Sequence, residues 1–199
     1  MDLKIKTKDN PGSDDIRKMI QLADDLLEGR GFEKDTGAAL SLYIEAAGRG
    51  SHQGLYGAGR IYTDYGEASR GLIYIKKAAS LGNGDAMTFL GMHYIEAGDT
   101  DRAEACLAPA AQMGNKDALY GLGYLCELRG DDAASCEYYR DAFSAGRSDA
   151  ALRLGTVYEK TNKDLALFWF RQGGDEASCD RLRALMEDLD VEIEYEDNI

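Results

Sequence analysis

The sequence is short of proline and of long apolar runs. It has 2 prolines in 199 residues and no long polar run, so we expect one continuous domain without a linker. No stretch approaches the roughly 20 apolar residues that a helix needs to span a bilayer. The first residues, MDLKIKTKDNPGSDD, lack the apolar core of a secretion signal. We therefore expect a cytoplasmic protein with no membrane partner.

Cysteine and histidine are too few and too scattered for a zinc site or a regular disulfide framework. The 4 cysteines include no C-x-x-C pair and there are only 2 histidines, so no metal is expected. We expect four reduced thiols, as is usual in a reducing compartment. Cys106 and Cys126 align with packing residues of other repeats, which predicts buried, inert thiols. His93 aligns with aliphatic residues, which predicts a half-buried packing residue.

The common catalytic motifs are also missing. The chain has no G-x-S-x-G, no H-E-x-x-H and no G-x-x-x-x-G-K-S/T, and no pair of carboxylates is singled out by its spacing. The glycines of YGLGYL lie inside a repeat and do not follow a strand, so they do not predict a phosphate-binding loop. We therefore expect no enzymatic activity and no cofactor.

Positive charge is scarce and unevenly placed. The formal net charge is −13, and between positions 174 and 199 ten acidic residues face two arginines, a local charge of −8. A nucleic-acid partner is disfavoured, because neutralising phosphates requires a basic face. The acidic end is either a solvated, solubilising segment or a patch that steers a basic partner.

What the chain does contain is an internal repeat. The motif L-G-x-x-Y recurs, and its glycine returns every 32 residues, at Gly59, Gly91, Gly123 and Gly155. A second series has the same spacing and runs through Gly50, Gly82, Gly114 and Gly146. The chain is therefore one unit copied about five times, with a degenerate first copy that begins near residue 16.

Each copy is predicted to be a pair of helices. In the copy that starts at Ala86, apolar residues return at helical spacing until Gly98, and Asp99 is in position to begin the second helix. The second helix ends at Gly114. Gly91 lies inside the first helix, where glycine costs about 1 kcal/mol relative to alanine. We expect this glycine to let the two helices pack backbone to backbone.

The C-terminal region has the pattern of one more helix. Four apolar residues share one face, which predicts a helix that closes the end of the repeat array: Leu182, Leu185, Met186 and Leu189. The predicted organisation is a flexible N-terminal segment (1–13), a repeat solenoid (14–179), and a capping helix with an acidic tail (180–199).

The repeat resembles a known family. Its pattern is A-x-x-x-L-G-x-x-Y, a glycine, and then A-x-x-(W/Y)-(Y/F)-x-x-A-A-x-x-G-(N/D), carried in one copy by Ala86, Leu90, Gly91, Tyr94, Gly98, Ala103, Ala110, Ala111, Gly114 and Asn115. This is similar to the Sel1-like repeat, a relative of the tetratricopeptide repeat (TPR), over roughly residues 16–174. The resemblance implies an all-α, right-handed α-solenoid of about five helix-turn-helix repeats with adaptor or scaffold roles. The loop between the two helices is shorter here than in most of the family.

The first helices carry the residue types that are enriched at protein interfaces, which are aromatic residues, methionine and arginine. Three registers of the first helix are predicted to face a concave groove, and the candidate partner-binding residues are Tyr56, Arg60, Phe89, Met92, Tyr120, Tyr124 and Arg153. The alternative is that some of these tyrosines pack between adjacent first helices.

We therefore expect a non-catalytic protein-interaction module, an adaptor, scaffold or regulator that binds a protein or peptide in this groove. A narrower alternative, supported by charge alone, is an immunity-type inhibitor that neutralises a basic toxin. Hydrolysis of β-lactams has been attributed to cysteine-rich relatives, but this chain lacks their cysteine framework, so a hydrolase is least favoured. The sequence leaves the oligomeric state open.

Overall fold

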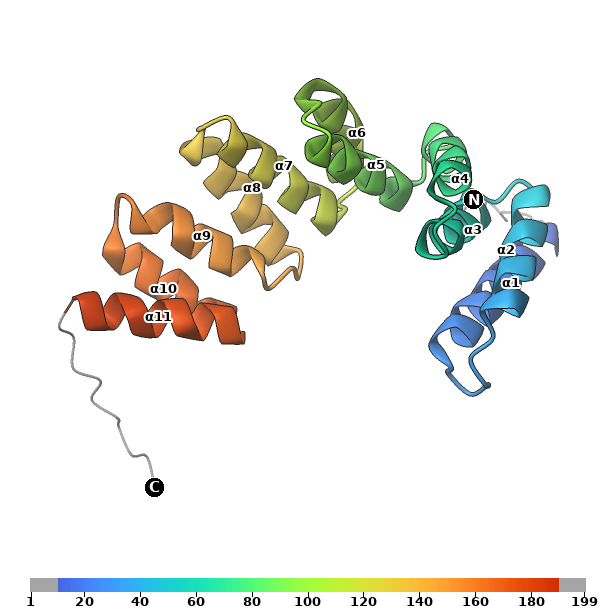
Figure 1. Cartoon of the computed structure of the whole chain (residues 1–199), viewed down its shortest axis with the longest axis horizontal. Coiled ribbons are helices and arrows are strands. Elements are labelled where there is room, and N and C mark those ends of the chain that lie inside the picture. Colours follow the sequence, from blue (N-terminus) through green and yellow to red (C-terminus); the bar gives the residue numbers. More distant parts are fainter. Residues whose placement is uncertain (1–10, 190–199) are drawn as a thin grey trace, which may run out of the picture. The chain divides into compact units, whose positions relative to one another are not determined.

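The computed structural model describes residues 11–189 and builds them from α-helices alone (Figure 1). The eleven helices of this range are α1 (Pro11–Glu28), α2 (Thr36–Gly48), α3 (His52–Asp64), α4 (Ala68–Ser80), α5 (Gly84–Glu96), α6 (Thr100–Gln112), α7 (Lys116–Leu128), α8 (Asp132–Ser144), α9 (Ala150–Glu159), α10 (Lys163–Gly173) and α11 (Glu176–Asp188). The predicted all-α repeat fold is confirmed, as five successive helix pairs followed by one further helix.

The regularity of the sequence sets the helix lengths. From α2 to α8 every helix has 13 residues, and each helix from α3 to α8 begins 16 residues after the one before it. Left-handed backbone, which favours glycine, follows the helix ends at Gly98 (φ 74°) and Gly114 (φ 80°). The carboxylate of Asp99 then caps α6, because it accepts a hydrogen bond from the Arg102 backbone N–H at 3.1 Å. The 32-residue repeat is thus two similar halves of 16 residues.

The chain divides into two compact units, Met1–Leu90 and Gly91–Ile199, and the division falls within α5. In the first unit α1 packs on α2, α2 on α3, and α3 on α4. A buried cluster joins the first three of these helices and consists of Ala23, Ala39, Tyr43, Ala58 and Ile61. The alanines let the helices approach closely, and the larger side chains fill the space between them.

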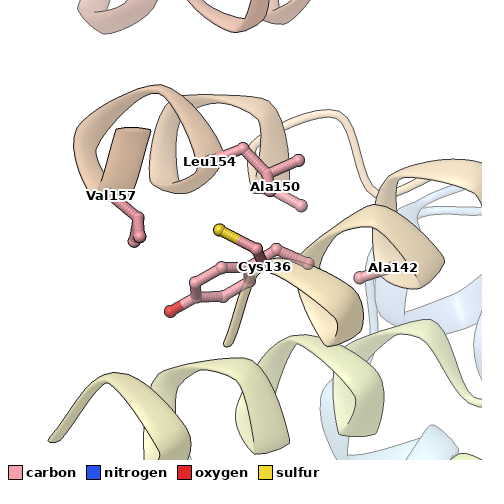
Figure 2. Close-up of a cluster of buried hydrophobic side chains, with 6 residues drawn as sticks. Cys136, Ala142, Ala150, Leu154 and Val157 are labelled. Atoms are coloured by element: carbon pink, nitrogen blue, oxygen red, sulfur yellow. The ribbon is translucent and has the colours of Figure 1, made fainter. Parts of the chain in front are cut away.

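The second unit packs in the same sequential order, from α6 on α7 to α10 on α11. Between α8 and α9 its core contains Cys136, Ala142, Ala150, Leu154 and Val157. Figure 2 shows Cys136 on α8 facing the helix that carries Leu154 and Val157. Each helix buries its apolar face against its neighbours in sequence, as in other helical repeats.

Helix α11 covers the last repeat, as predicted. It packs on α10 and contacts α9. Leu185 is buried there in a cluster with Phe170, and Leu182 and Leu189 pack against this cluster. Helix α1 begins at Pro11 and α11 at Glu176. Residues 1–10 and 190–199 lie outside the described residues, so the flexible N-terminal segment, the acidic tail and the domain boundaries stay predictions.

The repeat glycine makes room for a large side chain of the next helix. A Cβ atom at position 123 would lie only 2.7 Å from the ring of Tyr139. The second-helix partner is fully buried in every case. The pairs are Gly59–Ile75, Gly91–Leu107, Gly123–Tyr139 and Gly155–Phe170.

The expectation of backbone packing at Gly91 holds only in part, and the expectation for His93 is wrong. A Cβ on Gly91 would lie 2.4 Å from the Leu107 side chain and 3.3 Å from the backbone carbonyl oxygen of Ala103 on α6. Backbone approaches backbone more closely between α3 and α4, where a Cβ on Gly71 would lie 2.6 Å from the carbonyl oxygen of Gly59. His93 is exposed, and Ile95 occupies the buried position in that turn of α5.

The four cysteines are free thiols in different environments. Cys136 is buried, Cys106 and Cys126 are half-buried, and Cys179 is exposed. The expectation that Cys106 and Cys126 are buried is therefore wrong in degree, because the fully buried positions beside them are Leu107 on α6 and Leu125 on α7. Burial raises the pKa of the Cys106, Cys126 and Cys136 thiols.

Candidate interaction surface

The seven predicted partner-binding residues lie on the first helices of four repeats. Arg60 is exposed and the other six are half-buried, so all seven contribute to the surface. The division within α5 places three of them in the first unit, namely Tyr56, Arg60 and Phe89. The second unit holds Met92, Tyr120, Tyr124 and Arg153.

The first unit contains a hollow of about 660 Å³. Its wall comes from α1, α2, α3, the start of α5, and the loops that follow α1, α3 and α4. Tyr56 and Arg60 are part of this wall, whereas Phe89 is not. The volume lies within the range of roughly 300–1,000 Å³ that is usual for ligand pockets.

Tyr43 forms the buried side of the hollow. Its ring lies 2.6 Å from the position that a Cβ on Gly57 would take, so only glycine fits at position 57. Its hydroxyl donates a hydrogen bond to the carboxylate of Asp24 on α1. Burial and this hydrogen bond raise the pKa of Tyr43, which therefore stays a neutral donor. The contact fixes one carboxylate in the wall of the hollow.

Carboxylates outnumber cations around the hollow. Asp24 and Glu28 are one turn apart on α1, and Arg60 and Asp64 are one turn apart on α3, so each pair shares a helix face. The charged residues of the wall are Asp24, Glu28, Asp64 and Asp85 against Lys34 and Arg60. Aliphatic and aromatic side chains complete the wall, among them Ile20, Leu27, Ile61 and the 68% exposed Tyr65.

In the second unit the predicted residues belong to a hydrogen-bonded network. Arg153 Nε donates to the hydroxyl of Tyr120 at 3.1 Å, and its Nη1 lies 3.7 Å from Oε1 of Glu127. The hydroxyl of Tyr139 donates to the other Glu127 oxygen at 2.8 Å. Burial and this hydrogen bond raise the pKa of Tyr139. Each polar group of the network therefore holds a defined partner.

Tyr120 is held from a second direction by Arg147. The guanidinium carbon of Arg147 lies 3.9 Å from the centre of the Tyr120 ring, a cation–π contact. Arg147 is itself anchored by Asp117 at 2.7 Å and Asp149 at 2.9 Å. Tyr120 thus packs against Arg153 of the next first helix, as well as contributing to the surface.

Tyr124 and Met92 border the same region of the second unit. The guanidinium carbon of Arg153 lies 5.1 Å from the centre of the Tyr124 ring. The sulfur of Met92 lies 3.2 Å from the position that a Cβ on Gly121 would take. The structure thus brings Tyr120, Tyr124 and Arg153 together, and it places Met92 beside α7.

Sequence reasoning missed the second-helix tyrosines. Tyr43 and Tyr139 occupy the same register three repeats apart, and in both the hydroxyl binds an acidic side chain, Asp24 or Glu127. The 32-residue alignment contains this signal.

No serine, cysteine or histidine is among the residues that line the hollow. Within residues 11–189 no three His, Cys, Asp or Glu side chains are placed to hold a metal ion. In the same range, no helix is long and apolar enough to cross a membrane.

Comparisons with known proteins identify the fold of this chain. No protein-family model matches the sequence, and a search of curated proteins finds no match. A protective antigen of uropathogenic Escherichia coli strains, which displays an SLR fold, superposes with a TM-score of 0.79 at 22% identity, over 92% of this chain and 44% of that one. This chain thus spans less than half the length of that antigen.

Two further solved structures share the fold. A Sel1 repeat protein from Oxalobacter formigenes superposes with a TM-score of 0.76 at 20% identity, over 94% of this chain and 82% of that one. YrrB, a TPR protein with an unusual peptide-binding site, superposes with a TM-score of 0.54 at 19% identity, over 87% and 94%. The chain therefore has the helical-repeat fold of Sel1 and TPR proteins.

Proposed function

We propose that this chain is a non-catalytic protein-interaction module that binds a protein or peptide through the first helices of its repeats. The observation that carries the proposal is the hollow of the first unit, whose wall combines aromatic, aliphatic and charged side chains. Such mixed, concave surfaces are typical of recognition sites. The fold supports the proposal, since a TPR protein with a peptide-binding site shares it.

The proposed partner-binding residues fall into two groups, one in each unit. In the first unit Tyr56 and Arg60 line the hollow, and Phe89 is half-buried on α5. In the second unit Tyr120, Tyr124 and Arg153 are braced by one another and by their neighbours, and Met92 lies beside them. A braced surface loses little side-chain entropy on binding, which favours affinity.

Site-specific photo-crosslinking tests the proposal. A photoreactive phenylalanine analogue replaces Tyr56 in the wall of the hollow, and the protein is irradiated in cells of its native host. The matched control carries the same analogue at Ile73, which lies on the second helix α4 and is 68% exposed. We expect a defined protein adduct from position 56 and none from position 73. Equal capture by both positions, or capture by position 73 alone, would contradict a first-helix site.

A narrower candidate is an inhibitor that neutralises a basic toxin. The net charge of −13 and the carboxylates of the hollow favour it. The captured partner would then be a basic protein whose activity is lost when it is mixed with this chain in equal amounts. An acidic partner, or one that stays fully active in the complex, would exclude this candidate.

A further inference from the structure

We infer that the hollow of the first unit is a subsite for a lysine or arginine side chain, presented by an extended basic segment of the partner protein. The inference rests on the proposed interaction function and goes beyond it by naming the chemistry that the hollow accepts.

The arrangement of carboxylates points to a cation. Asp24 and Glu28 reach the hollow from α1, Asp64 reaches it from α3, and Asp85 from the start of α5. Asp24 is positioned by the hydroxyl of Tyr43, and a carboxylate that accepts one hydrogen bond keeps capacity for more. An acidic side chain entering here meets four like charges against two cations, Lys34 and Arg60. An apolar one desolvates charges without pairing them.

Asp64 supplies a charge that the chain does not use itself. Asp64 is exposed at the end of α3, and within residues 11–189 it takes part in no ion pair and no side-chain hydrogen bond, although Arg60 is one turn away on the same helix. Glu28 differs, because it pairs with Arg30 at 3.2 Å. The unpaired carboxylate at the wall of a hollow is the group that a partner's ammonium or guanidinium satisfies best.

The rest of the wall suits the aliphatic part of a lysine or arginine side chain and the backbone of the partner's basic segment. Tyr65 is 68% exposed and lines the hollow, so its ring is available to the aliphatic stem or the charged head of a cationic side chain. Arg60 is exposed and is also in the wall. Its guanidinium can donate to a backbone carbonyl of the segment, because a peptide presents one at every residue. The occupant is therefore an extended chain carrying a cation.

The test uses fluorescein-labelled decapeptide pools and the full-length protein. Two pools have the same randomised positions and differ only at the two central residues, which are Lys-Arg in one pool and Glu-Asp in the other. Fluorescence anisotropy measures binding at low ionic strength. We expect the Lys-Arg pool to bind at least tenfold more tightly. Equal binding of the two pools, or binding of neither, overturns the inference.

Charge-matched variants separate the hollow from general attraction to an acidic protein. Glu28→Gln with Asp64→Asn removes two charges from the hollow, and Asp101→Asn with Asp180→Asn removes two exposed charges from the second unit. Each exposed ion pair typically contributes a few-fold in affinity, so the first double variant is expected to weaken Lys-Arg binding about tenfold. The second is expected to leave it within twofold. Equal weakening by both overturns the inference.

Failure of the cation subsite and failure of the proposed interaction function give different results. If the Lys-Arg pool shows no preference while position 56 still captures a partner by photo-crosslinking, the cation subsite is wrong and the interaction module stands. If position 56 captures nothing and the pools do not bind, both are wrong. Tyr65→Ala is expected to weaken Lys-Arg binding about threefold without changing the melting temperature, since Tyr65 is a solvent-exposed rim residue.

Discussion

The ring of Phe170 occupies the space that a side chain at Gly155 would need. The same relationship joins a first-helix glycine to a fully buried second-helix side chain in each of four repeats. Glycine costs a helix about 1 kcal/mol relative to alanine, whereas full burial of a large apolar side chain contributes roughly 1.5–3 kcal/mol. The recurrence of glycine is thus explained by the side chain that it admits.

Adding a methyl group at this contact should destabilise the repeat. Gly155→Ala is expected to lower the free energy of unfolding by about 1–3 kcal/mol, because the methyl overpacks against the Phe170 ring. Gly48→Ala is the control, since nothing lies within 4 Å of its Cβ position at the end of α2. It should leave the urea midpoint unchanged or slightly raised. A Gly155→Ala protein as stable as the wild type would contradict the explanation that the repeat glycine makes room for the buried side chain of the next helix.

A buried hydroxyl on α11 is a stabilisation target. Ser178 is fully buried, and its Oγ has no hydrogen-bond partner among the described residues. Ser178→Ala is expected to raise the free energy of unfolding by about 1 kcal/mol, because an unpaired polar group leaves the core. Ser135 is equally buried, but its Oγ donates to the Asp132 carbonyl at 3.0 Å. Ser135→Ala should therefore lose stability in the same thermal melt, and a gain in both variants would argue against the difference in pairing.

Asn83 connects the loop before α5 to two other groups. Its side chain is buried, its Oδ1 accepts the Ala86 backbone N–H at 2.7 Å, and its Nδ2 lies 3.1 Å from Nδ1 of His52. Asn83→Ala should cost about 1–2 kcal/mol in chemical denaturation, as the loss of a helix cap does. Glu67 holds the equivalent position before α4 without a side-chain cap. Glu67→Ala should therefore cost less than half as much, and equal losses would show that the cap contributes little.

Thiol reactivity should follow burial. Cys179 is exposed, whereas Cys136 is buried and burial raises the pKa of its thiol, which lowers the fraction of reactive thiolate. We expect an aromatic disulfide reagent to modify one thiol of the native protein rapidly. Cys179→Ser should abolish that fast phase. A fast phase that survives the substitution would come from one of the three less exposed thiols, and it would contradict the expected order of reactivity.

The repeat architecture could be predicted from the sequence because it depends on the regular spacing of glycine and apolar residues. Glycine at fixed intervals, with Asp99 directly after Gly98, predicts the helix ends, and these are local events that one 16-residue half-repeat decides. The closing helix was predicted for the same reason, from the spacing of Leu182, Leu185 and Leu189.

The site was harder, because it depends on contacts between repeats. Spacing alone places Tyr56 and Tyr120 in one register, yet Tyr56 lines a hollow and Tyr120 is held by Arg147 and Arg153. The difference arises from their neighbours one repeat away, since Phe89 and Asn83 stand relative to Tyr56 where Arg153 and Arg147 stand relative to Tyr120. Such substitutions change which side chains fill the surface without changing the repeat.

The affinity of the captured partner for two alanine variants tests the central claim most directly. Tyr56→Ala removes an aromatic side chain from the wall of the hollow, and Ile73→Ala removes an exposed side chain from a second helix. Both proteins are first shown to melt at comparable temperatures. If the first helices bind the partner, Tyr56→Ala should raise the dissociation constant about thirtyfold, a change of about 2 kcal/mol, and Ile73→Ala should change it less than twofold. A large loss for Ile73→Ala with none for Tyr56→Ala would contradict the account.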